Sequence, residues 1–317
     1  MRIGIIGAGA VGGWIGARLA LAGHSVGMIA RGATLNAVRD DGLILTDLGE
    51  TLVAHPTATC EPHELGPQEL VIVAVKAPAL SAAVELARPL ITAHTIVVPM
   101  LNGVPWWFLP GERITSVDPI GSIEAALPFE QLIGCVVHAA CTRITPNNVS
   151  VNHGHPMILG EPGGGLSERV RTIADVLSAA SIPLDVTTDI RKAIWYKLWG
   201  NATVNPISAL TRVSVDRILQ QPGTRALLSD GMSELARLGE VIGCSVEQTV
   251  EDRIKVSERL GVFRTSMHND VEAGRPIELE ALLGAPVEIA HRHGVPVPTL
   301  ERLYGLTRLM GESLGLL

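Results

Sequence analysis

Short apolar runs alternate with helical patterns through the first half of the chain. Four runs rich in β-branched residues predict strands, at residues 2–6, 25–29, 70–75 and 95–99. Between the first two, apolar residues from Val11 to Ala22 recur at helical spacing, and Gly23 is suited to end that helix. Strands that alternate with helices in this way are typical of parallel βαβ units.

The pattern changes twice further along the chain. Residues 131–160 alternate like antiparallel strands, with a turn at Asn147-Asn148, and a helix and a short strand follow. From about residue 189 the remainder predicts long helices, at residues 190–204, 224–242, 246–258, 278–293 and 298–315. We therefore predict an α/β protein, with a Rossmann-type dinucleotide-binding domain over residues 1–188 and an all-helical domain over residues 189–317.

Length and charge narrow the classes of protein. A chain of 317 residues is long enough for two domains, each with its own core. The 25 basic and 32 acidic residues give a net charge of −7, which argues against nucleic acid as a partner. No segment approaches the ~18 uninterrupted apolar residues of a membrane span. We expect a cytoplasmic protein that binds small molecules, and the sequence leaves a homodimer open.

The metal-ligating residue types do not form a convincing site. The four cysteines are scattered, without the spacing of a zinc site, and are typical of buried residues in a reducing compartment. The pair of histidines in His153-Gly154-His155 has no third ligand nearby. We therefore expect no bound metal.

A glycine-rich segment follows the first predicted strand directly and opens a helix. It reads Gly7-Ala8-Gly9-Ala10-Val11-Gly12, the spacing of a dinucleotide-binding loop. In such a loop the first glycine allows the tight turn, the second lets the backbone approach a pyrophosphate, and the third permits close packing of helix on strand. The helix N-terminus attracts the phosphates. We predict that these six residues bind a dinucleotide.

The end of the second strand indicates which dinucleotide is bound. A carboxylate for the ribose 2′-hydroxyl is expected there, but the chain has Arg31, whose guanidinium suits a 2′-phosphate. This favours NADP(H) over NAD(H). Lys76 and Asn102 follow the next two strands, at the edge of the sheet where a cofactor would lie.

The helical half contains a row of polar residues in apolar surroundings. Lys197, Asn201 and Asn205 are spaced four apart, so they share one face of a helix. Two buried asparagines require partners, which leaves open either a ligand or a structural ladder of hydrogen bonds. Lys197 could donate a proton to a carbonyl oxygen while the amides hold hydroxyl or carboxylate groups. Pro206 predicts that the helix kinks or breaks there.

A third polar cluster lies further on. Ser266 stands at a predicted helix start, and Glu278 begins a long apolar helix. On the residues alone, the helix dipole explains Glu278 better than a functional site does. We expect His268, two residues after the serine, to lie at the surface.

These segments together resemble one family along almost the whole chain, the ketopantoate reductases (2-dehydropantoate 2-reductases). The resemblance is carried by the following motifs: the glycine loop, Arg31, Val75-Lys76-Ala77, Leu101-Asn102-Gly103, His138-Ala139-Ala140, Trp195-x-Lys197-x3-Asn201-x3-Asn205-Pro206, Ser266-Met267-x2-Asp270 and Glu278. The spaced Lys-Asn-Asn-Pro motif with the serine and the glutamate is far more specific than the glycine loop.

The resemblance implies NADPH-dependent reduction of a 2-oxo acid, ketopantoate, to a 2-hydroxy acid on the way to pantothenate and coenzyme A. It implies Lys197 as general acid and Glu278 as a carboxylate that organises the substrate near the nicotinamide ribose. The other implied roles are as follows: Asn102 touches cofactor and substrate, Asn201, Asn205 and Ser266 bind substrate, and Arg31, Lys76 and Ala140 belong to the NADP site.

Two positions depart from the family pattern. Val215 and Phe263 stand where some members carry asparagines that contact the substrate. A more apolar pocket would favour a different branched or aromatic 2-oxo acid. A non-catalytic NADP-binding protein is the alternative from another class, but it has no need of a proton donor.

Overall fold

The computed structural model describes residues 1–152 and 155–317. The first two residues of the motif His153-Gly154-His155 therefore lie outside the described residues. Its contacts divide the chain into two compact units. The N-terminal unit comprises residues 1–101 and 122–190, and the helical unit comprises residues 102–121 and 191–317. The sequence-based division differs in two respects, because it places residues 102–121 in the first domain and ends that domain at residue 188 instead of 190.

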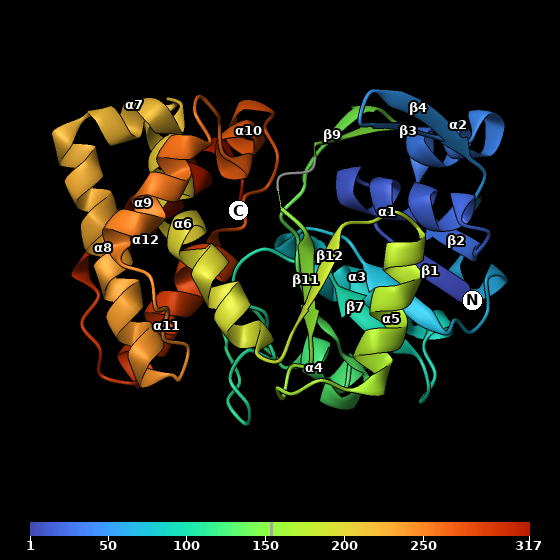
Figure 1. Cartoon of the computed structure of the whole chain (residues 1–317), viewed down its shortest axis with the longest axis horizontal. Coiled ribbons are helices and arrows are strands. Elements are labelled where there is room, and N and C mark those ends of the chain that lie inside the picture. Colours follow the sequence, from blue (N-terminus) through green and yellow to red (C-terminus); the bar gives the residue numbers. More distant parts are fainter. Residues whose placement is uncertain (153–154) are drawn as a thin grey trace. The chain divides into compact units, whose positions relative to one another are not determined.

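A parallel sheet of five strands forms the centre of the N-terminal unit (Figure 1). The unit's strands are β1 (Arg2–Ile6), β2 (Ser25–Ile29), β3 (Leu43–Asp47), β4 (Glu50–Ala54), β5 (Thr57–Thr59), β6 (Leu70–Val73), β7 (Ile96–Pro99), β8 (Gly134–Val136), β9 (Ala140–Thr145), β10 (Asn148–Asn152), β11 (Met157–Gly160) and β12 (Leu184–Thr187). The main sheet has the order β5-β2-β1-β6-β7, in which Ile3 pairs with Val26 on one side and with Leu70 on the other. The last four residues of β1 are all buried, although their side chains alternate between the two faces, as expected for a parallel sheet covered on both faces.

Helices and two smaller sheets complete the N-terminal unit. The helices of this unit are α1 (Ala10–Leu21), α2 (Gly32–Asp41), α3 (Leu80–Ala87), α4 (Ser122–Ala126) and α5 (Glu168–Ala179). The second sheet has the order β4-β3-β10-β9, and α5 packs on the third, of order β12-β11-β8. Helix α1 contacts both the main and the second sheet. It can approach both because it carries glycines: a Cβ at Gly16 would lie 2.7 Å from Met28 Cε, and one at Gly13 would lie 2.8 Å from Val149 Cγ1.

The helical unit is built from long helices around a buried core (Figure 1). Its helices are α6 (Ile190–Thr211), α7 (Val215–Gln220), α8 (Pro222–Val241), α9 (Val250–Arg259), α10 (Ser266–Glu272), the π-helical turn η5 (Glu280–Gly284), α11 (Ala285–Arg292) and α12 (Pro298–Leu314). The predicted break at Pro206 is wrong, since α6 continues to Thr211. The proline removes one helical hydrogen bond, but the burial of side chains such as Leu198, Trp199 and Ile207 along α6 offsets that loss.

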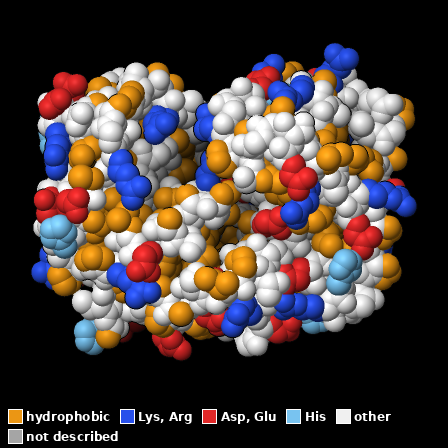
Figure 2. All heavy atoms as spheres, turned by 180° about the vertical axis from the view of Figure 1, so that it is seen from behind, with side chains coloured by type: hydrophobic (Ala, Val, Ile, Leu, Met, Phe, Trp, Pro, Cys, Tyr) orange, Lys and Arg blue, Asp and Glu red, His pale blue; other side chains and the backbone are white. Residues whose placement is uncertain are grey.

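The predicted fold class is confirmed: a Rossmann-like parallel sheet precedes a helical region. None of the helices in the described part of the chain is long and apolar enough to cross a membrane. On the face drawn in Figure 2, basic, acidic and apolar side chains are interspersed.

Candidate functional site

The glycine loop adopts the conformation that its sequence predicts. Gly7 has φ +104°, and a Cβ there would lie 2.6 Å from the Ala74 carbonyl oxygen. A Cβ at Gly12 would collide with the Gly7 carbonyl, so only glycine allows α1 to start so close to β1. A Cβ at Gly9 would meet nothing within 4 Å and would occupy the open space in front of the loop. This open cradle of backbone fits a pyrophosphate.

A cavity of about 350 Å³ lies beside this loop in the N-terminal unit. Its lining consists of Ile6, Gly7, Ala8, Gly9, Ile29, Ala30, Arg31, Thr34, Val75, Ala79, Ala82, Ala83, Leu86 and Arg143. Arg31 closes β2 and begins α2, as predicted. A lining that combines small apolar side chains with two arginines fits the adenosine part of a phosphorylated dinucleotide.

Five other residues predicted for the cofactor lie in the same unit but outside the lining of this cavity, whereas Asn102 and Glu278 belong to the helical unit. Ala10, Val11 and Gly12 form the first turn of α1. Lys76 follows β6 and precedes a short 3₁₀ turn. Ala140 is the first residue of β9.

Three predicted residues of the helical unit are joined by hydrogen bonds. Lys197 Nζ donates to Asn102 Oδ1 at 2.7 Å, and Asn102 Nδ2 donates to Glu278 Oε2 at 3.1 Å. The amide therefore turns its oxygen to the ammonium and its NH₂ to the carboxylate, as electrostatics requires. Glu278 is only 6% exposed, and Lys197 is half-buried. Residues far apart in the sequence thus hold a lysine ammonium in a defined position.

The backbone next to Asn102 explains how the loop reaches Glu278. Gly103 has φ +79°, and its neighbour Val104 donates its N–H to the Ala281 carbonyl oxygen at 2.8 Å. A Cβ at Gly103 would collide with that carbonyl. Ala281 belongs to the π-helical turn η5, a local irregularity that often accompanies functional sites. Close backbone contact at Gly103 brings the Asn102 amide within reach of the carboxylate.

Aromatic packing attaches the same segment to α6. The Phe108 ring stacks on Trp195 with centroids 5.7 Å apart, and the Arg191 guanidinium lies 5.3 Å above the Phe108 ring. Trp195 Nε1 donates to the Leu235 carbonyl oxygen at 3.0 Å. Both rings are fully buried, and Trp195 lies two residues before Lys197. The packing therefore fixes the helix that carries the lysine against the segment that carries Asn102.

A carboxylate on α11 binds the far end of this segment. Glu288 accepts hydrogen bonds from the backbone N–H groups of Thr115, at 2.8 Å, and Ser116, at 2.7 Å, and from both hydroxyl groups. Burial alone would raise the pKa of Glu288, but the hydrogen bonds from Ser116 and Thr115 outweigh it and hold the pKa below its ordinary value. Sequence reasoning did not single out Glu288, since a glutamate on a helix carries no signal of a distant partner.

The two asparagines of the polar row differ from Asn102. Asn201 is half-buried and Asn205 is only 5% exposed. Within residues 1–152 and 155–317, neither side chain has a hydrogen-bonding partner. Among these residues the two amides therefore do not form a structural ladder of hydrogen bonds. An amide in a largely buried position without a protein partner favours the binding of a ligand.

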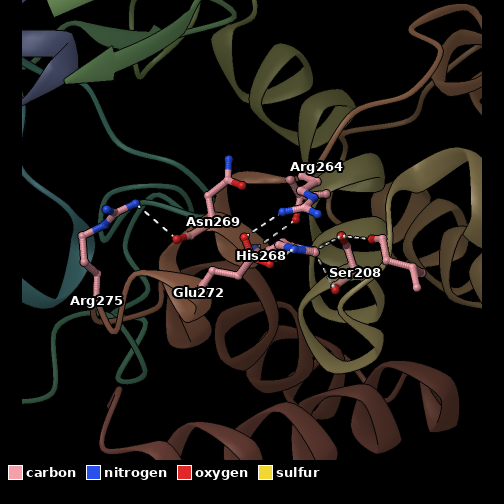
Figure 3. A network of polar contacts seen from close by, with 8 residues as sticks. Ser208, Arg264, His268, Asn269, Glu272 and Arg275 are labelled. Carbon is pink, nitrogen blue, oxygen red and sulfur yellow. Dashed lines mark hydrogen bonds and ion pairs between the residues drawn. The ribbon is translucent and has the colours of Figure 1, made fainter. Parts of the chain in front are cut away.

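Helix α10 carries Ser266 as its first residue and is fixed to α6 by a histidine (Figure 3). His268 Nδ1 lies 3.1 Å from both Ser208 Oγ and the Ser208 carbonyl oxygen, and Nε2 lies 3.1 Å from Glu272 Oε1. The expectation of a surface histidine is wrong, because His268 is fully buried. Its position two residues after Ser266 places it on the inner face of a short helix capped by Thr265. Ser266 itself is exposed.

Among the described residues, no group of three or more histidine, cysteine, aspartate or glutamate side chains could hold a metal ion. Sequence reasoning also missed Arg143, which lines the cavity beside the glycine loop. Its signal was weak, since one arginine in an alternating strand is usually a solvated surface residue.

Comparisons with known proteins agree along the whole chain. The family described as ketopantoate reductase PanE/ApbA matches residues 3–164, and its C-terminal part matches residues 189–311. A 2-dehydropantoate 2-reductase of Mesorhizobium japonicum is 40% identical over 99% of both chains.

Solved structures give the same result. A protein of Ralstonia solanacearum MolK2 assigned as a ketopantoate reductase is 44% identical, with a TM-score of 0.96 over 100% of this chain and 99% of that one. A 2-dehydropantoate 2-reductase of Geobacter metallireducens GS-15 is 27% identical, with a TM-score of 0.87 over 98% and 100% of the two chains.

Proposed function

Because the chain belongs to the ketopantoate reductase PanE/ApbA family, we propose that it reduces 2-dehydropantoate to pantoate with NADPH. The hydrogen-bonded row of Lys197, Asn102 and Glu278 is the observation that carries the proposal. A binding protein without activity would not need an ammonium held in place by an amide and a buried carboxylate. The product leads to pantothenate and coenzyme A.

Lys197 is the general acid of the proposed reaction. When NADPH is bound, its nicotinamide supplies a hydride to the carbonyl carbon of the oxo acid, and NADP⁺ is left. The Lys197 ammonium gives a proton to the carbonyl oxygen, which becomes the hydroxyl of the product. Asn102 holds the ammonium through its oxygen, and Glu278 orients Asn102 by accepting from its NH₂ group. Glu278 also organises the substrate near the nicotinamide ribose.

Asn201, Asn205 and Ser266 bind the substrate. The amides of Asn201 and Asn205 have no partner among the described residues, which leaves their donors and acceptors for the carboxylate and hydroxyl groups of a small hydroxy acid. Ser266 is exposed at the start of α10, whose position on α6 is fixed by His268. This role for the two asparagines also explains why polar residues occur among the buried apolar residues of α6.

The cofactor is held by the N-terminal unit. The loop from Gly7 to Gly12 binds the pyrophosphate through its backbone, and Arg31 binds the 2′-phosphate that distinguishes NADP(H). Lys76 and Ala140 of the same unit also bind the cofactor, and Asn102, which belongs to the helical unit, contacts both cofactor and substrate. In this assignment residues 1–188 are the NADP-binding domain and residues 189–317 the substrate domain, of a cytoplasmic enzyme that acts alone or as a homodimer.

A panel of 2-oxo acids tests the function. Each acid is offered with NADPH or with NADH, and oxidation is followed by the nicotinamide absorbance. We expect the highest kcat/KM with 2-dehydropantoate and NADPH. Binding of NADPH without turnover of any acid would indicate the non-catalytic NADP-binding protein instead.

The arrangement of Val215 and Phe263 supports a second candidate. The Val215 N–H donates to the Phe263 carbonyl oxygen at 2.9 Å, so the two departures from the family pattern lie side by side. An apolar pair there favours a branched or aromatic 2-oxo acid other than 2-dehydropantoate. If that acid is the better substrate in the panel, Phe263→Asn should shift the ratio of kcat/KM values back toward 2-dehydropantoate.

A further inference from the structure

The cavity beside the glycine loop contains a second arginine that the proposed function does not use. Arg31 comes from the end of β2, and Arg143 comes from β9, in the second sheet of the N-terminal unit. Thr34, on the first turn of α2, lies in the same lining, and none of the described lining residues is acidic. Two cations and a hydroxyl group thus surround one space.

The register of the second sheet explains how Arg143 reaches the loop. Arg143 pairs with Val149 across the antiparallel strands β9 and β10, and Val149 contacts Gly13 in the first turns of α1. Along β9, Cys141 packs against the core, whereas Ile144 is exposed to 60%. Because side chains alternate along a strand, Arg143 shares the inward face with Cys141 and extends toward the start of α1.

The two guanidinium groups differ from those of three other arginines of this unit, which are held by carboxylates. Arg18 pairs with Asp47, Arg88 with Glu85 and Arg169 with Glu161. Arg31 and Arg143 are exposed, and neither side chain has a hydrogen-bond or ion-pair partner among the described residues. Unpaired guanidinium groups that line a cavity without carboxylates favour an anionic ligand.

A phosphorylated dinucleotide offers two anionic groups that Arg143 could bind, the pyrophosphate and the 2′-phosphate. The pyrophosphate of a dinucleotide is served by the loop backbone and the start of α1. A phosphate monoester such as the 2′-phosphate carries a charge of about −1.5 to −2 near neutral pH, which a single arginine does not neutralise. Two guanidinium groups match that charge.

We propose that Arg143 is the second arginine of the 2′-phosphate site and, with Arg31, determines the preference for NADP(H) over NAD(H). The proposal rests on the proposed function, whose cofactor site it deepens. Arg143 is separated from Arg31 by more than a hundred residues, and the second sheet brings the two to one cavity.

Binding measurements on the whole protein test the proposal without recourse to turnover. Isothermal titration calorimetry compares 2′,5′-ADP with 5′-ADP, and NADP⁺ with NAD⁺, on the wild type and on Arg143→Gln. We expect roughly 10- to 100-fold weaker binding of both 2′-phosphorylated ligands, as for a lost charged hydrogen bond, and unchanged binding of the other two. Arg143→Lys should recover part of the loss. Arg171→Gln, an exposed arginine of α5 outside the cavity lining, is the matched control.

The other outcomes overturn the assignment. Equal losses for all four ligands would place Arg143 on the pyrophosphate, and no loss would make it a surface residue. A denaturant titration of Arg143→Gln identifies a loss that comes from unfolding, and Arg31→Gln then supplies the reference for a genuine 2′-phosphate contact. If the wild type binds 2′,5′-ADP through Arg143 but reduces no 2-oxo acid, the proposed function fails and this proposal stands.

Discussion

The polar groups of the two units differ in whether they are already paired within the protein. In the N-terminal unit, Arg31 and Arg143 line a cavity and have no partner among the described residues. In the helical unit, Lys197, Asn102 and Glu278 are already joined by hydrogen bonds of 2.7 and 3.1 Å. The two arginines of the first site are exposed to solvent, whereas the charged groups of the second site are hydrogen-bonded to the protein itself.

This difference fits the roles that we propose for the two sites. An arginine that is hydrated before the ligand binds has little free-energy cost, and the phosphate of the ligand then supplies the anionic partner for a charged hydrogen bond. Proton transfer requires a donor within a few tenths of an ångström of its productive position, and that position has to exist before the substrate arrives. The loop from Asn102 to Gly121 belongs to the helical unit for the same reason, since it supplies the amide that holds the lysine.

The sharpest test of the comparison removes the ammonium. Lys197→Ala should lower kcat by ~10²- to 10⁴-fold, the usual contribution of a positioned general acid, and should leave the Kd of NADPH nearly unchanged. Stopped-flow turnover and NADPH fluorescence titration measure the two quantities. Lys255→Ala, which removes an exposed lysine of α9, is the control. A comparable loss of NADPH affinity would show that the two sites are not separable in this way.

A second test acts on the backbone that positions Asn102. Gly103→Ala places a Cβ against the Ala281 carbonyl at a positive φ and should cost ~3 kcal/mol of unfolding free energy, together with about tenfold in kcat. Gly111→Ala is a matched control in the same segment, because its φ is +77° but its Cβ would meet nothing within 4 Å. That variant should lose only ~1 kcal/mol. Urea titrations of both variants measure the loss of unfolding free energy. Equal losses would mean that the close approach of Gly103 to Ala281 does not contribute to stability.

Much of the fold could be predicted from the sequence. Four of the five strands of the main sheet and the helix after the glycine loop have strong local patterns, and the structure confirms them. Strands β3, β4 and β5 were not predicted. Strand β5 has only three residues, and β3 and β4 belong to a sheet that is completed by β10, about a hundred residues further on. Strands β3 and β4 matter for the site, because the sheet that they form with β10 and β9 brings Arg143 to the cavity.

The polar contacts were harder to predict than the elements. The spacing of Lys197, Asn201 and Asn205 correctly indicated one helix, but it could not show that Asn102 would contact the lysine. The error at His268 has the same origin: a histidine in a polar stretch has the local pattern of a surface residue, and only packing against Ser208 buries it. Local patterns therefore predict the elements, whereas contacts between distant residues decide which polar groups are paired.

The last test concerns the attachment of the loop to the helical unit. Glu288→Gln replaces a carboxylate that accepts from Thr115 and Ser116 and should lower the free energy of unfolding by about 1–2 kcal/mol at pH 7, since a charged hydrogen bond is partly screened by solvent here. Glu312→Gln, which breaks an exposed pair with Arg308 on α12, should change it by less than about 0.5 kcal/mol.

The pH dependence of that difference identifies its cause. The pKa of Glu288 is lowered in the folded state, because the hydrogen bonds from Ser116 and Thr115 outweigh burial, so the unfolded state binds the proton more readily. The stabilisation is therefore complete above the unfolded pKa of about 4.3 and is lost as the pH falls through the lower folded value. The gap between wild type and Glu288→Gln should be constant from about pH 7 to pH 5.5 and should close toward pH 3. A gap that persists at pH 3 would mean that the shape of the side chain, and not its charge, holds the loop in the helical unit.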